Sequence, residues 1–144
     1  MSEKKIRLMI IDDEPQIRKV LSYIILNSEI EKFEIIEIET AEDALRMLKV
    51  KEPDIIICDY LLENTSGIDF FKKISVDYPF VVKILISGNV NYGELRDAVL
   101  RGAVFKFLSK PFNEEEILSV LKEAVIKVRD NYQKKDLAER LKDF

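Results

Sequence analysis

Apolar residues occur in short continuous runs that alternate with segments of helical spacing. Two of the runs, over 6–11 and 55–58, are almost uninterrupted, which is typical of strands buried on both faces of a parallel sheet. The segment 33–40 alternates apolar residues with glutamates and is therefore predicted to be an outer strand. Apolar runs over 80–86 and 104–108 complete a set of five predicted strands.

Helix start and stop signals lie between these strands. Pro15 suits the first turn of a helix, where its missing N–H costs nothing, and that helix should end near Asn27. Thr40 followed by Asp43 forms a variant capping box at the start of the next helix. Gly102 directly follows a predicted helix over 92–101, at the position where helices often end with a residue in the left-handed backbone conformation. A further helix follows the polar loop that ends at residue 67.

The last helix is predicted to begin after Asn113, which caps it with Glu116 three residues later. Its apolar face continues to Val128, after which the chain is mostly charged and the apolar register changes phase. We therefore expect one domain over 1–128, followed over 129–144 by a helical extension or the start of a linker.

Alternation of strands and helices through short loops predicts an α/β fold with a doubly wound, five-stranded parallel sheet and an extended last helix. Parallel neighbours need right-handed helical crossovers, and these cover both faces of the sheet. The 144 residues, 47% apolar and 35% charged, are typical of one globular domain.

Charge and hydropathy exclude several classes of protein. A net charge of -4 argues against general affinity for nucleic acid or for an anionic membrane surface. No segment approaches the roughly 18 apolar residues of a membrane-spanning helix, and no uncharged signal core follows the N-terminus. We therefore expect a cytoplasmic protein. Cys58 is the only cysteine and is expected to pack in the core, so no intrachain disulfide can form.

The chain contains no histidine, which removes imidazole catalysis, histidine metal ligands and any role as a phosphohistidine carrier. Its glycines are isolated, so that neither a dinucleotide-binding fingerprint nor a P-loop is present. A nucleotide or flavin enzyme on the same kind of sheet is therefore disfavoured.

Polar side chains stand at the ends of four predicted strands: Asp12 and Asp13, Asp59, Ser87, and Lys110. The ends of parallel strands share one edge of the sheet, where open α/β sheets bind their ligands. Taken singly, such residues are more often caps, turn formers or solvated surface residues. The prediction of a functional site therefore rests on their joint placement.

Three carboxylates at one edge would repel one another unless a hard cation lay between them. Oxygen ligands without histidine or cysteine favour Mg²⁺ over zinc or copper. Lys110 suits a phosphate group, and the Ser87 hydroxyl can donate a hydrogen bond to one. Together these are the parts needed to transfer a phosphoryl group onto Asp59 as an acyl phosphate.

The same residues resemble the receiver domain of two-component response regulators over 6–128. The motifs are Asp12-Asp13, Asp59 with Gly67 eight positions later, Ser87-Gly88, and Lys110-Pro111. The resemblance implies a flavodoxin-like fold with strand order 2-1-3-4-5. It also implies a phosphoacceptor signalling domain, which catalyses its own phosphorylation and dephosphorylation rather than acting as an enzyme on other substrates.

Residue roles follow from the resemblance. Asp59 would be the phosphoacceptor, and Asp12, Asp13, Asp59 and the backbone carbonyl of Leu61 would hold Mg²⁺. The phosphoryl donor would be a phosphohistidine on a sensor histidine kinase or phosphotransfer protein.

A second group of residues would respond to phosphorylation. Ser87 and Lys110 would bind the phosphoryl oxygens, Lys110-Pro111 would be a cis peptide, and Phe107 falls at the family's switch aromatic. Phosphorylation would then reshape the face formed by the helix over 92–101, the last strand and the last helix. A homodimer or partner surface on that face is the expected readout.

One position departs from the family pattern, because Glu63 stands where receivers often carry a proline, four residues after the acceptor. Its carboxylate could alter Mg²⁺ affinity or the lifetime of the phosphorylated state. The alternative interpretation keeps the fold without the chemistry, as a phosphorylation-independent pseudo-receiver that acts as a dimerisation or docking module.

Overall fold

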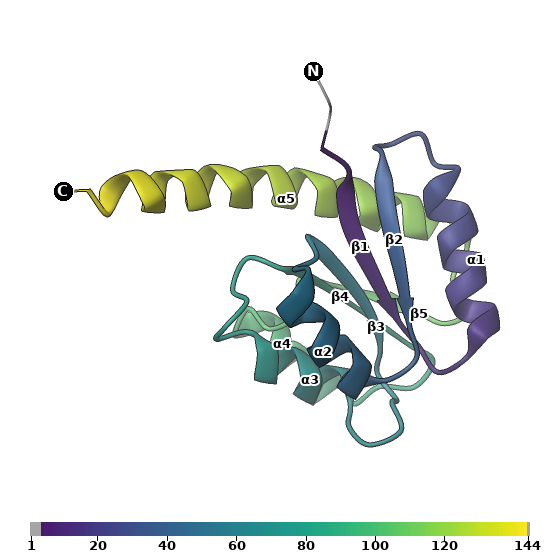
Figure 1. The fold of residues 1–144 in the computed structure, drawn as a ribbon. Helices are drawn as coiled ribbons and strands as arrows, with labels where there is room; N and C mark the ends of the chain where they lie inside the picture. Colours follow the sequence, from purple (N-terminus) through teal and green to yellow (C-terminus); the bar gives the residue numbers. More distant parts are fainter. Residues whose placement is uncertain (1–3, 144) are drawn as a thin grey trace.

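The computed structural model describes residues 4–143 and contains one five-stranded sheet with five helices (Figure 1). The strands are β1 (Ile6–Ile11), β2 (Phe33–Ile38), β3 (Ile55–Asp59), β4 (Val82–Ser87) and β5 (Lys106–Ser109). The helices are α1 (Pro15–Leu26), α2 (Ala41–Val50), α3 (Gly67–Ile74), α4 (Tyr92–Leu100) and α5 (Glu114–Leu141).

All neighbouring strands are parallel, in the order β2-β1-β3-β4-β5. This confirms the doubly wound sheet and the order 2-1-3-4-5. The uninterrupted apolar strand β3 is buried along its whole length and lies in the centre, whereas the alternating strand β2 lies at an edge and is only partly buried. The difference in pattern reflects the number of faces and neighbours that cover each strand.

The limits of three strands differ from the prediction, and one of them, β2, ends two residues earlier than expected, at Ile38. β4 and β5 each begin two residues later than expected, at Val82 and Lys106, and end one residue later, at Ser87 and Ser109. Val81 and Val104 are buried just before these strands without strand pairing, whereas Phe80 and Phe105 are half-buried. Val104, for example, is buried but donates its N–H to Ala98 O at the end of α4 (3.3 Å). The apolar runs in the sequence are therefore longer than the paired strands, because residues outside the strand pairing are buried as well.

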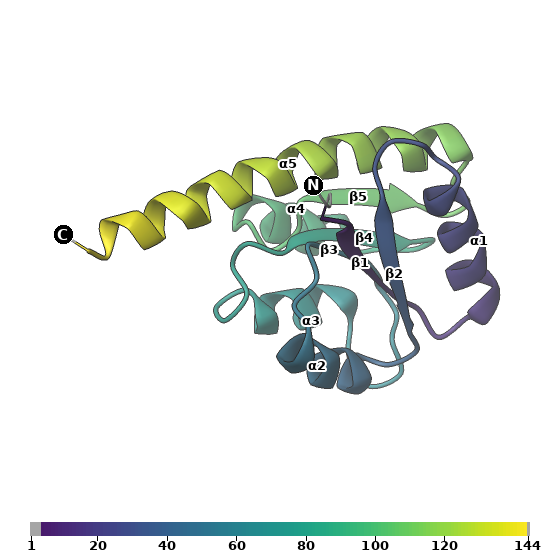
Figure 2. The ribbon, with the colours of Figure 1, turned by 45° about the horizontal axis from the view of Figure 1, so that its top comes forward.

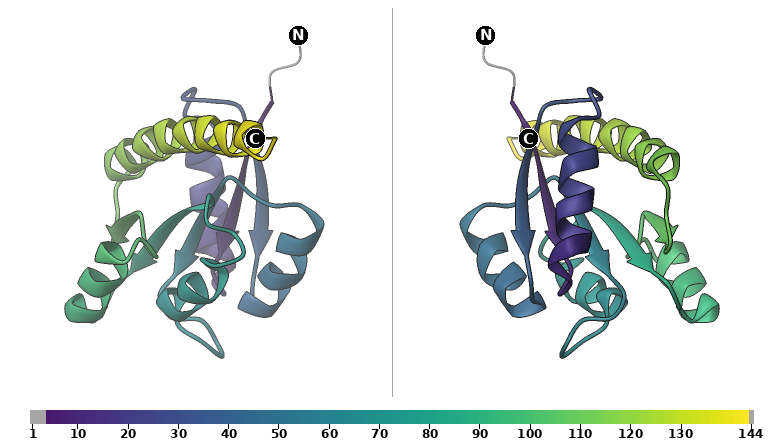
Figure 3. Two further views of the ribbon diagram at one scale, coloured as in Figure 1. Left: turned by 90° about the vertical axis from the view of Figure 1, so that its left-hand side faces the viewer. Right: turned by 90° about the vertical axis from the view of Figure 1, so that its right-hand side faces the viewer.

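The helices cover the sheet on both faces, α1 and α5 on one and α2, α3 and α4 on the other. Figure 2 shows the sheet between α5 above and α2 and α3 below, and Figure 3 shows α2, α3 and α4 in a row. Each face has its own apolar core, because alternate side chains of the central strands point to opposite sides. Cys58 is buried in the core on the α2–α4 side, as predicted.

The predicted caps are confirmed. Thr40 Oγ1 accepts a hydrogen bond from Asp43 N (3.1 Å), and Asn113 Oδ1 accepts one from Glu116 N (2.8 Å). Gly102 follows α4 with a φ of 78°, in the left-handed region that favours glycine. These contacts fix where α2, α4 and α5 begin or end.

Helix α5 has 28 residues and runs through the predicted change of register without a break. Its contacts with the body of the domain continue past Val128. Asn131 Nδ2 donates to Phe80 O (2.8 Å), the Tyr132 hydroxyl donates to Asp54, and Lys135 pairs with Glu52 (3.1 Å). Beyond these residues the helix extends past the sheet (Figure 1). The end of the domain at residue 128 remains a prediction.

Within residues 4–143, no helix is both long enough and apolar enough to cross a membrane.

Candidate functional site

Three acidic side chains meet at the carboxyl edge of the sheet. Asp12 and Asp13 directly follow β1, and Asp59 is the last residue of the neighbouring strand β3. One carboxylate oxygen of each lies within 4.8 Å of those of the other two. Asp12 and Asp59 are buried, whereas Asp13 is exposed. The structure thus brings together the three carboxylates that the sequence pattern placed at one edge.

Lys110 faces this cluster from the end of β5. Its Nζ lies 3.4 Å from Asp12 Oδ2 and 3.4 Å from Asp59 Oδ1. Its backbone N–H donates to Ser87 O (2.8 Å), so the loop after β5 is tied to the end of β4. The peptide bond between Lys110 and Pro111 is cis, as the resemblance implied.

Burial and charge act on the pKa values of these groups in opposite directions. Burial raises the pKa of Asp12, and Lys110 offsets only part of that effect. Burial also raises the pKa of Asp59, and the nearby carboxylate of Asp12 adds to the rise. For Lys110 burial favours the neutral amine, but Asp12 and Asp59 outweigh it and raise the pKa. Burial is thus the main cause of the raised pKa of both acids, and Lys110 opposes it only in part.

A hard divalent cation suits this donor set. The ligand atoms are carboxylate oxygens, and burial raises the pKa of Asp12 and Asp59 although Lys110 lies 3.4 Å from both. Asp12, Asp13 and Asp59 are the side chains that would hold Mg²⁺. Leu61, whose backbone carbonyl is the fourth predicted ligand, lies two residues beyond Asp59 in the β3–α3 loop. The metal itself and the role of Leu61 remain predictions.

Ser87 and Phe107 lie on the two strands beyond Asp59. Ser87 is buried at the end of β4, and its Oγ accepts a hydrogen bond from Asn89 N (3.0 Å). Phe107 is half-buried on β5, beside Leu85 of β4, and packs against the core on the α2–α4 side. Their roles in phosphate binding and switching remain predictions.

Close packing explains why a glycine, Gly67, stands eight residues after Asp59. A Cβ at this position would lie 2.4 Å from the carbonyl oxygen of Asp59 and 2.7 Å from Leu85 Cδ1. The start of α3 therefore packs against the end of β3 at a distance that only glycine permits. Gly67 N also donates to Tyr60 O (2.7 Å), which closes the loop that follows Asp59.

Several contacts at the site were not predicted from the sequence. Glu14 Oε1 lies 3.9 Å from Lys110 Nζ, and Arg18 Nη1 donates to the backbone carbonyl of Asp12 (2.6 Å). On the opposite side of the site, the Tyr60 hydroxyl donates to Glu94 of α4 (2.9 Å). Glu14 directly follows Asp13 in the sequence, and this position could have indicated its contact with Lys110. The other two join elements whose packing is not encoded in a local pattern.

Comparison with known proteins agrees with this geometry. The family model of the response regulator receiver domain matches residues 8–122. The hydrogenase transcriptional regulatory protein HoxA of Cupriavidus necator is 23% identical over 125 residues, covering 87% of this chain and 25% of that protein. The heme response regulator HssR of Staphylococcus saprophyticus is 32% identical over 119 residues, covering 83% of this chain and 50% of that protein.

The solved structure of the chemotaxis response regulator CheY4 of Vibrio cholerae has the same fold, with a TM-score of 0.73 and 20% identity. The alignment covers 84% of this chain and 99% of CheY4. The chain spans about a quarter of the length of HoxA, so the comparison with HoxA concerns one domain of a larger protein. With the family model covering most of the chain, this protein belongs to the response regulator receiver domain family.

Proposed function

We propose that this receiver domain accepts a phosphoryl group on Asp59 from a phosphohistidine of a sensor histidine kinase or phosphotransfer protein. The observation that carries the proposal is the convergence of Asp12, Asp13, Asp59 and Lys110 at one edge of the sheet. Family membership supports the same function.

In the transfer, a carboxylate oxygen of Asp59 attacks phosphorus. The O–P bond forms as the P–N bond of the phosphohistidine breaks, and its electron pair leaves with the imidazole. Mg²⁺, when bound, neutralises charge on the phosphoryl oxygens. Lys110, 3.4 Å from Asp59 Oδ1, is placed to bind an oxygen of the transferred group, and its raised pKa keeps it charged. Histidine, which the chain lacks, comes from the donor.

The readout that we propose is a change of the face formed by α4, β5 and α5. A phosphoryl group adds about 1.5 to 2 negative charges, which draw Ser87 and Lys110 inward. Movement of Ser87 vacates space that Phe107 can fill, and this biases an existing equilibrium between two conformations. A homodimer or an output partner would recognise the altered face. A phosphoryl mimic that leaves the amide resonances of α4, β5 and α5 unchanged would contradict this readout.

Intact mass after incubation with acetyl phosphate tests the chemistry. We expect one phosphoryl adduct on the wild type only with Mg²⁺, none on Asp59→Asn, and a normal adduct on the control Asp69→Asn, which changes an exposed carboxylate of α3. A folded wild type without an adduct would contradict the proposal. It would favour the phosphorylation-independent pseudo-receiver, a docking or dimerisation module in the cytoplasm.

A further inference from the structure

Arg18 connects helix α1 to the acidic site. It lies in the second turn of α1, and only 16% of its side chain is exposed. Its Nη1 donates to the backbone carbonyl of Asp12 at 2.6 Å. Helical side chains lean toward the start of their helix, so an arginine one turn into α1 can reach back over the β1–α1 turn.

The carbonyl that Arg18 binds belongs to the peptide unit between Asp12 and Asp13. A peptide unit is planar, so the direction of this carbonyl also sets the direction of the Asp13 N–H and the path of the chain between the two acidic residues. The other polar groups of Asp12 are held as well. Its N–H donates to Ile38 O (3.1 Å), and its Oδ1 accepts from Glu14 N (2.9 Å). Arg18 provides the remaining contact, on the carbonyl.

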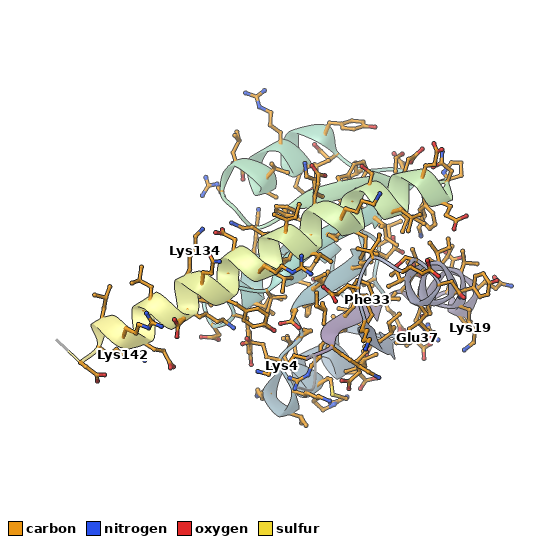
Figure 4. The ribbon with its side chains drawn as sticks, turned by 90° about the horizontal axis from the view of Figure 1, so that it is seen from above. Lys4, Lys19, Phe33, Glu37, Lys134 and Lys142 are labelled. Atoms are coloured by element: carbon orange, nitrogen blue, oxygen red, sulfur yellow. The ribbon has the colours of Figure 1, made fainter. Side chains whose placement is uncertain are left out.

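Glu37 of the edge strand β2 holds the guanidinium from the other side. Its Oε1 lies 3.5 Å from Arg18 Nε, and its Oε2 accepts a hydrogen bond from Ser22 (3.2 Å). Lys19 is a weaker neighbour at 4.0 Å. Figure 4 shows Glu37 and Lys19 at the α1 side of the molecule. The guanidinium thus lies between an anchored carboxylate and the peptide that joins two candidate metal ligands.

The position of Arg18 is poorly explained by stability alone. Its Nε is buried, and no hydrogen-bond partner for it lies among the described residues. Burying a charged donor without full pairing costs free energy. A contact that is costly for folding and directed at the site is more readily explained by a role at the site.

We propose that Arg18 is a positioning residue of the Mg²⁺ site, and that Glu37 acts through it. The inference rests on the proposed function, because the site must bind Mg²⁺ for its geometry to matter. Arg18 orients the Asp12–Asp13 peptide, and Glu37 fixes the guanidinium. Neither residue contacts the metal or the phosphoryl group.

Charge and geometry make opposite predictions for the loss of Arg18. A positive charge close to a cation site opposes cation binding, so removal of the charge by itself would tighten Mg²⁺ binding. Removal of a positioning contact would weaken it, as loss of outer-shell partners does in other metal sites. The sign of the change therefore separates the two effects.

The first experiment compares Arg18→Met, Arg18→Lys and the control Arg46→Met, which changes an exposed arginine of α2. Mg²⁺ affinity is measured by titration of amide resonances without a phosphoryl donor. We expect the Mg²⁺ dissociation constant to rise by about tenfold in Arg18→Met and to rise also in Arg18→Lys, which keeps the charge but loses the planar fork. An unchanged or lower dissociation constant in Arg18→Met would overturn the proposal.

The second experiment tests Glu37 by Mg²⁺ binding and tests Arg18 in metal-free protein. Glu37→Gln should weaken Mg²⁺ binding in the wild type but add little to Arg18→Met, because its effect passes through Arg18. In metal-free protein, the amide resonances of Asp12 and Asp13 should shift in Arg18→Met and stay in place in Arg46→Met. Unmoved resonances would overturn the positioning role whether or not the wild type binds Mg²⁺. A wild type that gains no phosphoryl adduct would instead contradict the proposed function.

Discussion

At the scale of single residues, the buried carboxylates of the acidic site lower the stability of the metal-free fold. Asp12 and Asp59 are buried beside each other, and burial raises the pKa of both carboxyl groups. A raised pKa of an acid means that its ionised form destabilises the folded state. At neutral pH the carboxylates therefore oppose folding until a cation compensates them.

Replacing one buried carboxylate with its neutral isostere should therefore stabilise the metal-free protein. In Asp12→Asn the amide oxygen can still accept from Glu14 N while one negative charge is removed. We expect the free energy of unfolding to rise by about 1 kcal/mol in EDTA, or roughly 3 °C in melting temperature. In excess Mg²⁺ the wild type should become the more stable protein, because it keeps all its ligands.

Calorimetry of both proteins with and without Mg²⁺ measures this reversal. The control Asp77→Asn changes an exposed carboxylate and should melt with the wild type in both buffers. Lower stability of Asp12→Asn in EDTA would show that Lys110 compensates the cluster fully.

A second buried charge, Lys83 on β4, gives a prediction about pH. Burial lowers the pKa of Lys83, whose Nζ donates to Val81 O (3.1 Å) and to Tyr78 O (3.4 Å). The unfolded chain therefore binds the proton more tightly than the fold. The resulting loss of stability is present below the lowered pKa and is relieved as the pH rises toward 10.5, the ordinary value.

The comparison of wild type with Lys83→Met isolates this effect, because the other titrating groups are common to both proteins. We expect the stability of the wild type relative to Lys83→Met to increase as the pH rises from neutral toward 10.5. Urea unfolding at several pH values measures it, and exposed Lys49→Met serves as the control. If the stability difference between the wild type and Lys83→Met did not change with pH, the fold would not shift the pKa of Lys83.

At the scale of elements, close packing around the end of β3 determines which residues can begin α3. A Cβ on Gly67 would overlap the Asp59 carbonyl, a backbone group that cannot move aside as a flexible side chain would. Gly93 of α4 differs, because its nearest obstacle is the side chain of Asn91 at 3.3 Å. Gly93 therefore serves as the control position for a substitution of Gly67.

Gly67→Ala should lower the free energy of unfolding by about 2 kcal/mol, the usual cost of overpacking. Because the displaced atom is the carbonyl of Asp59 itself, Mg²⁺-dependent phosphorylation should slow as well. Gly93→Ala should be neutral or slightly stabilising, since alanine favours a helix. Chemical denaturation and the acetyl phosphate assay measure both effects. A Gly67→Ala protein as stable and active as Gly93→Ala would contradict the close approach.

Local sequence patterns predicted the elements better than their limits. The apolar runs correctly predicted all five strands, the family resemblance supplied their order in the sheet, and capping residues such as Asn113 fixed helix starts. β5 begins two residues later than predicted, because Val104 is buried but does not pair with a neighbouring strand. Contacts between elements, such as Arg18 with the Asp12 carbonyl, were not predicted, since they depend on how α1 packs on the sheet.

At the scale of the whole molecule, α5 both covers one face of the sheet and extends beyond it (Figure 1). Its interaction with the domain does not stop where the apolar pattern lapses. Asn131 is buried, and Lys135 lies over the ring of Phe80 while pairing with Glu52. By contrast, Leu137 and Leu141 are exposed. Within residues 4–143, the contacts between α5 and the rest of the domain therefore end near residue 135.

Two truncations distinguish the predicted boundary at 128 from the contacts in the structure. A chain that ends after Lys135 should be as stable as the full chain. A chain that ends after Val128 should lose about 2 kcal/mol, because it lacks the Asn131 hydrogen bond to Phe80 O and the Tyr132 hydrogen bond to Asp54. Both should still be phosphorylated, since the acidic site lies at the opposite end of the strands. Equal urea stability of all three proteins would place the end of the domain at 128, with α5 beyond it acting only as a connector.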